Sequence, residues 1–85
     1  MLSIVLVEDD SRLANLVQNF LQQHSFQVTV LDSGSQAVEK TTELQPDLVI
    51  LDIMLPELDG FSICRQLRTS YQKPILFLTA KDSPI

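Results

Sequence analysis

The chain lacks most of the residues from which disulfides, zinc sites and nucleic-acid surfaces are built. It has one cysteine and one histidine among 85 residues, so an internal disulfide is excluded and a zinc site is nearly excluded. It has 6 lysines and arginines against 11 aspartates and glutamates. The resulting net charge of −5 argues against direct binding to DNA or RNA, which needs a basic surface.

Long apolar runs are lacking as well. No run approaches the roughly 20 residues that span a bilayer, so no membrane contact is expected. The first apolar run has no basic residues before it and is broken by acids directly after Val7, which is not the pattern of a signal peptide. The lone Cys64 fits a reducing compartment, and together these absences predict a cytoplasmic protein.

What is present is a globular composition, 45% hydrophobic and 20% charged, in a chain long enough for one small domain, residues 1–85. Four short apolar runs predict strands, at Ser3–Val7, Gln27–Leu31, Leu48–Asp52 and Pro74–Thr79. Segments with helical spacing separate them, which gives the order βαβαβαβ. With right-handed crossovers this order predicts an α/β fold, a doubly wound parallel sheet with helices on both faces.

The helical segments carry start and stop signals. In the first segment, Asp10 or Ser11 can cap the N-terminus. One apolar stripe is predicted along this segment, formed by Leu13, Leu16, Val17, Phe20 and Leu21. In the second segment, Ser33 and Gln36 have the spacing of a capping box, and Pro46 ends the helix. The third helix is expected to begin in the stretch that holds Phe61, Cys64 and Leu67.

Acidic residues stand where two of these strands end. Asp52 closes the apolar run of the third strand, and an acidic triplet that begins with Glu8 and Asp9 follows the first strand. Burial of an ionised carboxylate costs too much free energy for a purely structural role, unless the end of the strand is open to solvent or to a metal ion. If the strand order is 2-1-3-4, strands 1, 3 and 4 are neighbours spaced about 4.8 Å apart. Their carboxyl ends, where ligands bind in such sheets, carry Glu8 and Asp9, then Asp52, then Thr79.

Three carboxylates in one small concavity repel one another, and a hard divalent cation relieves the repulsion. Mg²⁺ takes oxygen ligands, keeps several waters and commonly combines one or two carboxylates with phosphate oxygens. The pattern therefore predicts phosphoryl chemistry, in which Asp52 is the nucleophile that forms an acyl phosphate. The hydroxyl of Thr79 is expected to donate to the phosphoryl oxygens. Asp10, the third acid of the triplet, is expected to cap the following helix instead.

Four motifs stand in a fixed order along the chain, Val5–Asp10 (VLVEDD), Pro46–Pro56 (PDLVILDIMLP), Asp59–Gly60 and Leu78–Ala80 (LTA). In this order and spacing the chain resembles the receiver domain of bacterial two-component response regulators over its whole length. The acid pair and the LDIMLP segment are most similar to those of regulators that have a winged-helix DNA-binding output domain.

The resemblance implies a flavodoxin-like fold with strand order 2-1-3-4. It implies that Asp52 is the phosphoacceptor and receives its phosphoryl group from a sensor histidine kinase. Asp9 and Asp52 would bind Mg²⁺, or Mn²⁺, directly. Glu8 would bind the ion through water and Met54 through its backbone carbonyl, and Thr79 would be the switch hydroxyl. Such a domain assists its own phosphoryl transfer and is not a turnover enzyme.

The family domain is longer than this chain. Its fourth helix, its fifth strand with a functional lysine, and its fifth helix are therefore expected to be absent, as is the output domain through which such regulators bind DNA. Lys81 stands at a different loop position from that lysine. Without the covering helices the last strand becomes an edge, so self-association is expected.

Two other classes of protein share parts of this pattern. Phosphatases of the haloacid dehalogenase type need a second acid two residues after the nucleophile, and Met54 stands at that position, so this class is rejected. A receiver-like interaction module that associates without phosphorylation is the second class. The acid pocket argues against it, and the missing lysine segment argues for it. Incubation with a small phosphodonor and Mg²⁺, followed by intact mass measurement, separates the two.

Overall fold

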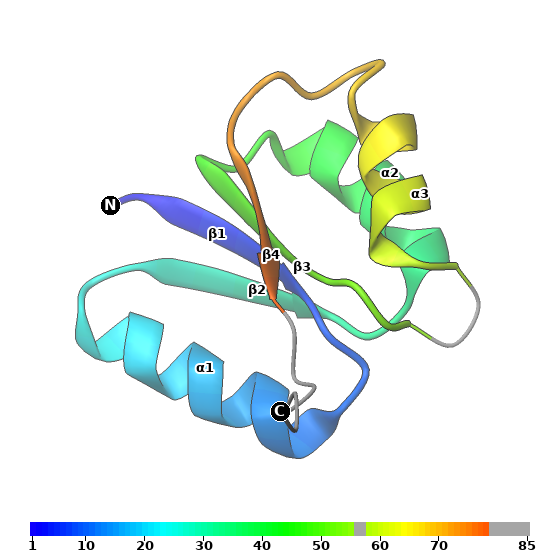
Figure 1. Ribbon diagram of the computed structural model, residues 1–85. Coiled ribbons are helices and arrows are strands. Elements are labelled where there is room, and N and C mark those ends of the chain that lie inside the picture. Colours follow the sequence, from blue (N-terminus) through cyan, green and yellow to red (C-terminus); the bar gives the residue numbers. More distant parts are fainter. Residues whose placement is uncertain (56–57, 79–85) are drawn as a thin grey trace, which may run out of the picture.

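The computed structural model describes residues 1–55 and 58–78 (Figure 1). Strands and helices alternate along it as β1 (Ser3–Val7), α1 (Ser11–Gln23), β2 (Gln27–Leu31), α2 (Gly34–Leu44), β3 (Leu48–Asp52), α3 (Gly60–Leu67) and β4 (Ile75–Leu78). The predicted bounds hold for β1, β2 and β3. β4 begins at Ile75, one residue later than predicted, and its predicted last residue, Thr79, lies outside the described residues. No helix in the described part of the chain is long and apolar enough to cross a bilayer.

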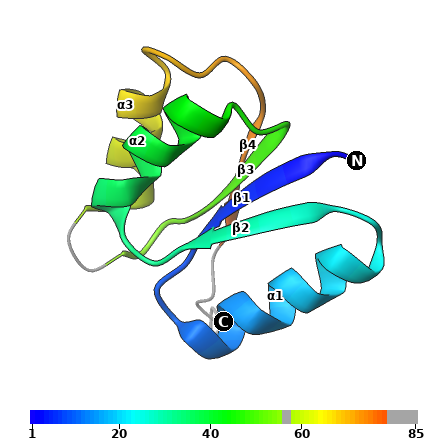
Figure 2. The ribbon, with the colours of Figure 1, turned by 180° about the vertical axis from the view of Figure 1, so that it is seen from behind.

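The strands form one parallel sheet in the order β2-β1-β3-β4. Figures 1 and 2 show α1 on one face of this sheet and α2 with α3 on the other. The predicted doubly wound α/β fold with strand order 2-1-3-4 is confirmed. Val7 of β1 lies between Leu31 of β2 and Leu51 of β3. The carboxyl ends of these strands therefore meet at one edge of the sheet.

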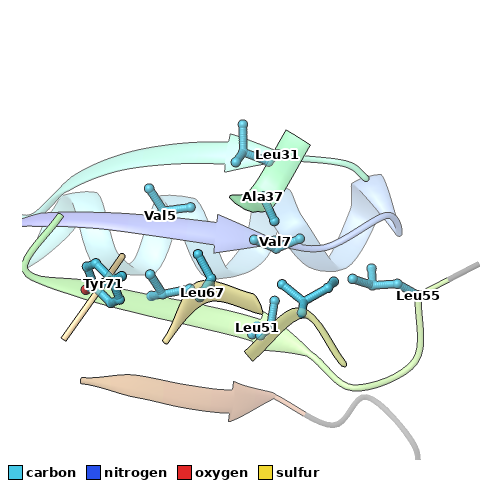
Figure 3. Close-up of a cluster of buried hydrophobic side chains, with 10 residues drawn as sticks. Val5, Val7, Leu31, Ala37, Leu51, Leu55, Leu67 and Tyr71 are labelled. Carbon is cyan, nitrogen blue, oxygen red and sulfur yellow. The ribbon is translucent and has the colours of Figure 1, made fainter. Parts of the chain in front are cut away.

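Each face of the sheet has its own hydrophobic core. The larger cluster, shown in Figure 3, lies on the side of α2 and α3 and comprises Val5, Val7, Leu31, Ala37, Val49, Leu51, Leu55, Ile63, Leu67 and Tyr71. The smaller cluster, on the side of α1, comprises Ile4, Leu6, Ala14 and Ile50. Alternate residues of β1 and β3 enter opposite clusters, which explains why both strands are apolar throughout. Burial of one such aliphatic side chain contributes about 1.5–3 kcal/mol.

Helix α1 packs on the sheet through a narrower face than the sequence predicted. Ala14 is buried, and Val17 and Leu21 pack against the smaller cluster. Leu16 and Phe20 are 68% and 58% exposed, so the sheet covers only part of the predicted apolar stripe. Both lie on the side of the stripe that is turned away from Ala14, and a helix resting on one face of a sheet covers only a limited arc of its circumference.

The two ends of helix α2 differ in how well the sequence predicted them. Ser33 is the N-cap residue, but its side chain makes no cap hydrogen bond within the described part of the chain, so the predicted capping box is wrong. The Ser33 hydroxyl lies 3.2 Å from the Ser35 hydroxyl instead. At the other end, Gln45 adopts a left-handed conformation with φ 47° directly before Pro46. The predicted stop at Pro46 is confirmed, because a residue before proline is disfavoured in the helical region.

Tyr71 ties the loop after α3 to the loop before β3. Its side chain is fully buried in the larger cluster, and its hydroxyl donates a hydrogen bond of 2.9 Å to the carbonyl oxygen of Pro46. Thr41 of α2 is also fully buried, but its hydroxyl has no hydrogen-bond partner among the described residues. The two side chains form a matched pair, because one buried hydroxyl is bonded and the other is not.

Tyr71→Phe is expected to lower the free energy of unfolding by about 1–2 kcal/mol, because the Pro46 carbonyl loses its buried donor. Thr41→Val removes a buried hydroxyl that has no bond to lose, so the stability is expected to stay unchanged or to rise slightly. Urea denaturation of both variants measures the difference. A loss in Tyr71→Phe no larger than that in Thr41→Val would contradict a stabilising role for this hydrogen bond.

Candidate functional site

Three carboxylates meet at the carboxyl edge of the sheet. Glu8 and Asp9 follow β1, and Asp52 is the last residue of β3, the strand that pairs with β1. One carboxylate oxygen from each residue lies within 4.8 Å of the other two. The parallel register produces this convergence, since Val7 pairs with Leu51 and the next residue of each strand is an acid. We call Glu8, Asp9 and Asp52 the acidic cluster.

The members of the acidic cluster differ in burial. Glu8 and Asp52 are only 2% and 4% exposed, whereas Asp9 is exposed. One oxygen of Glu8, Oε2, accepts the backbone N–H of Asp10 at 3.0 Å. Its other oxygen, Oε1, is buried and has no hydrogen-bond partner among the described residues. Asp52 Oδ1 accepts the backbone N–H of Met54 at 3.1 Å, which orients the carboxylate of Asp52.

Burial raises the pKa of Glu8 to about 7. The N–H of Asp10 opposes this rise, and the nearby carboxyl groups of Asp52 and Asp9 add to it. Desolvation and neighbouring negative charge both disfavour the ionised form of a carboxyl group. Without a cation, Glu8 is therefore close to half protonated at neutral pH, and the acidic cluster carries less than its full negative charge.

Open cavities flank the acidic cluster on two sides. One, of about 540 Å³, is lined by Asp9, Ile53, Met54, Leu55 and Asp59. The other, of about 340 Å³, is lined by Glu8, Asp9, Ser11, Ala14, Asn15, Val30, Asp32 and Gln36. Asp9 lines both cavities and is the exposed member of the cluster, so the acidic cluster is accessible to solvent at Asp9.

The other predicted site residues have different places. Met54 follows β3 in the loop beside the larger cavity, with its side chain 58% exposed. Its backbone N–H holds Asp52, and the metal-binding role of its carbonyl stays a prediction. Thr79 lies outside the described residues. Asp10 accepts the N–H groups of Arg12 and Leu13 at 3.0 and 3.3 Å, which confirms it as the cap of α1.

The sequence did not single out Gly60 as a neighbour of the acidic cluster. This glycine is the first residue of α3, is buried, and donates its N–H to the carbonyl oxygen of Ile53 at 2.9 Å. The Asp59–Gly60 pair was noted only as part of a motif. Its contact with the end of β3 depends on how α3 returns to the sheet, which no local pattern reveals.

A doubly wound parallel sheet in the order 2-1-3-4, with buried acids at the carboxyl ends of its two central strands, defines the class of flavodoxin-like domains that carry an acidic site at this edge. The sequence profile of the response regulator receiver domain matches residues 4–85. The chain belongs to this family, so the predicted membership is confirmed.

Among curated proteins, the chain is similar to the transcriptional regulatory protein RstA of Escherichia coli, with 49% identity over 81 residues. The match covers 95% of this chain and 34% of RstA, so the chain spans about a third of that relative. Among solved structures, the BeF3-activated N-terminal receiver domain of Klebsiella pneumoniae RstA is 46% identical, with a TM-score of 0.88 and coverage of 95% of this chain and 69% of that one.

A solved structure with lower sequence identity contains a magnesium ion. The receiver domain of a Pseudomonas aeruginosa sensor histidine kinase is 32% identical, with a TM-score of 0.88. The match covers 94% of this chain and 68% of that one. That structure is described as having a magnesium ion coordinated in its active-site cleft. The chain is therefore similar in fold to a receiver domain that binds magnesium in its active-site cleft.

Proposed function

We propose that Asp52 is the phosphoacceptor of a two-component response regulator and receives its phosphoryl group from a sensor histidine kinase. One observation carries the proposal: the carboxylate of Asp52 is buried at the end of a central strand and lies within 4.8 Å of the carboxylates of Glu8 and Asp9. Two buried acids this close together cost folding free energy, so their retention favours a chemical role over a structural one.

The acidic cluster fits a magnesium ion. All its donors are carboxylate oxygens, which Mg²⁺ prefers, and Glu8 Oε1 is a buried oxygen without a partner among the described residues. We assign direct binding to Asp9 and Asp52, binding through water to Glu8, and a backbone ligand to the carbonyl of Met54. Mn²⁺ has the same preference for oxygen ligands and is proposed as a substitute. When bound, the ion neutralises charge on the transferring phosphoryl group.

The chemical step uses the carboxylate of Asp52. The Met54 N–H fixes the orientation of this carboxylate, and one of its oxygens forms a bond to phosphorus as the bond between phosphorus and the kinase histidine nitrogen breaks. The leaving imidazole retains or takes up a proton, and the product is an acyl phosphate on Asp52. Thr79 is proposed to donate its hydroxyl to a phosphoryl oxygen.

The proposal for the longer protein follows from the relatives. A transcriptional regulator such as RstA implies a DNA-binding output domain elsewhere in the protein, and we propose a cytoplasmic location for it. We propose residues 1–85 as part of the receiver domain, which transfers a phosphoryl group to itself and does not turn over an external substrate. Self-association stays a prediction.

The full-length protein is expected to gain the mass of one phosphoryl group when it is incubated with phosphoramidate and Mg²⁺, because phosphoramidate replaces the phosphorylated histidine of the kinase. Intact mass spectrometry measures the adduct. Removal of the metal with EDTA is expected to prevent labelling, since the acidic cluster then repels the incoming phosphoryl group. A folded protein that binds Mg²⁺ and gains no mass would favour the phosphorylation-independent interaction module.

A further inference from the structure

Gly60 lies directly against the backbone of Asp52. A Cβ atom at position 60 would stand 2.6 Å from the carbonyl oxygen of Asp52 and 2.9 Å from the Cα of Ile53. Both neighbours are backbone atoms, which cannot rotate away as a side chain can. Among the described residues no glycine has a positive φ, so Gly60 is required for space and not for its backbone conformation.

The peptide of Asp52 is held by β4 on the side opposite Gly60, so it cannot simply move away from an atom added at position 60. On its far side β3 pairs with β4, where Asp52 is the partner of Leu78. The N–H of Ile53 also donates to the carbonyl oxygen of Leu78 at 3.2 Å. The backbone that carries the Asp52 carboxylate is therefore held between β4 and the first residue of α3.

Helix α3 is anchored as well. Asp59 caps it by accepting the N–H and the hydroxyl of Ser62 at 2.9 and 3.0 Å. Ile63 and Leu67 are fully buried in the larger cluster. Because α3 is held in place, an atom added at position 60 cannot be accommodated by a movement of the helix alone. The end of β3 is therefore displaced as well.

We propose that Gly60 is a positioning residue for Asp52: its missing side chain lets α3 begin in contact with the Asp52 peptide, and this contact fixes the Asp52 carboxylate relative to Glu8 and Asp9. This inference rests on the proposed function. Ordinary van der Waals contact begins at 3.4 Å, so a methyl group at position 60 requires a displacement of about 0.8 Å from the Asp52 oxygen. Functional groups in such sites tolerate only about 0.5 Å, and Mg²⁺ demands near-ideal geometry.

Gly34 provides a matched control. It is also a buried glycine at the first position of a helix, α2. A Cβ atom there would meet Ile63 Cδ1 at 2.8 Å, which is the far end of a flexible side chain, and Leu58 Cβ at 3.4 Å. Neither neighbour belongs to the acidic cluster. Gly34→Ala therefore adds the same methyl group to the core, against a side chain of α3 that can rotate and not against the backbone of Asp52.

The test compares Gly60→Ala and Gly34→Ala with the wild type in the full-length protein, at a temperature where all three are folded. Calorimetric titration gives the Mg²⁺ affinity, and intact mass over time gives the rate of labelling by phosphoramidate. Gly60→Ala is expected to lower the labelling rate by about 10- to 100-fold and to weaken Mg²⁺ binding, since a shift near 1 Å can cost that much. Gly34→Ala is expected to stay within about twofold of the wild type in both.

Three results would overturn the inference. The first is a folded Gly60→Ala with wild-type Mg²⁺ affinity and labelling rate, and the second is an equal loss in Gly34→Ala. If Gly60→Ala does not fold in buffer, the titration is repeated in a stabilising osmolyte such as sucrose, where the variant is expected to fold and to show the weakened Mg²⁺ affinity. Failure to fold under that condition as well is the third, because Gly60 would then serve the fold as a whole. A wild type that takes no phosphoryl group refutes the proposed function, and the Mg²⁺ affinities still decide on Gly60.

Discussion

Asp52→Asn in the full-length protein is expected to reduce labelling by phosphoramidate to background. The amide keeps the shape of the side chain and an oxygen that can accept the Met54 N–H. It cannot form an acyl phosphate, because an amide lacks the nucleophilic carboxylate oxygen. Intact mass after incubation with Mg²⁺ measures the loss, and a thermal melt shows that the variant is folded.

Asp10→Ala is the matched control for Asp52→Asn, since it removes another acid from the same edge of the sheet. Asp10 is exposed and its carboxylate caps α1 through the N–H groups of Arg12 and Leu13. Loss of the cap is expected to cost about 1 kcal/mol of stability and to leave labelling intact. Loss of labelling in a folded Asp10→Ala protein would show that the acids of the site are assigned wrongly.

The metal-free protein is expected to lose stability as the pH rises from about 5 to about 8. Burial raises the pKa of Glu8 from 4.5 to about 7, so the folded state holds a proton that the unfolded state has released. This contribution is complete below about pH 4.5 and is lost as the pH rises through about 7. Urea denaturation in EDTA across this pH range measures it.

Glu8→Gln is expected to remove most of this pH dependence and to stabilise the metal-free protein at pH 8, because the neutral amide cannot ionise. Glu39→Gln, the same substitution at an exposed position of α2, is the control and is expected to keep the wild-type slope. Hydrogen bonds from Ser3 and Ser62 lower the pKa values of Asp47 and Asp59. Their contributions are lost as the pH falls below the normal aspartate range, outside this window.

Mg²⁺ competes with the proton on Glu8, so its stabilising effect is expected to be larger at pH 8 than at pH 6. The midpoint of thermal unfolding, measured with and without millimolar Mg²⁺ at both pH values, shows the difference. An equal Mg²⁺ effect at the two pH values, or an unchanged pH slope in Glu8→Gln, would contradict the assignment of this titration to Glu8.

The central strands were predictable from the sequence because their apolar runs are continuous and end in acids. β1 and β3 are buried on both faces after their first residues, so successive positions share one apolar environment. The start of β4 was missed by one residue, because Pro74 has no N–H for the ladder, although its carbonyl accepts the N–H of Val49 at 3.2 Å. The acidic cluster was predictable for a related reason: parallel strands bring their carboxyl ends to one edge.

The errors concern contacts that no local pattern specifies. Leu16 and Phe20 have the spacing of a buried stripe, but the arc of α1 that is covered depends on how the helix lies on the sheet. Ser33 and Gln36 have the spacing of a capping box, yet the hydroxyl of Ser33 lies next to that of Ser35. Gly60 was recognised as part of a motif, but its contact with Asp52 was not predicted, because this contact joins the end of a strand to the start of a later helix.

The parallel topology also has a consequence for the order of folding. β1 is synthesised before β2 and β3 and lies between them, so Ser3 pairs with Gln27 and Ile4 pairs with Leu48 only after those residues have been made. Such distant pairings close large loops before any contact compensates for the lost chain entropy, which slows folding. During synthesis, the backbone N–H and C=O groups on both edges of β1 therefore cannot all be paired until Asp52, the last residue of β3, has left the ribosome. Occupation of those edges by a chaperone, or by a neighbouring nascent chain, would compete with the assembly of the acidic cluster.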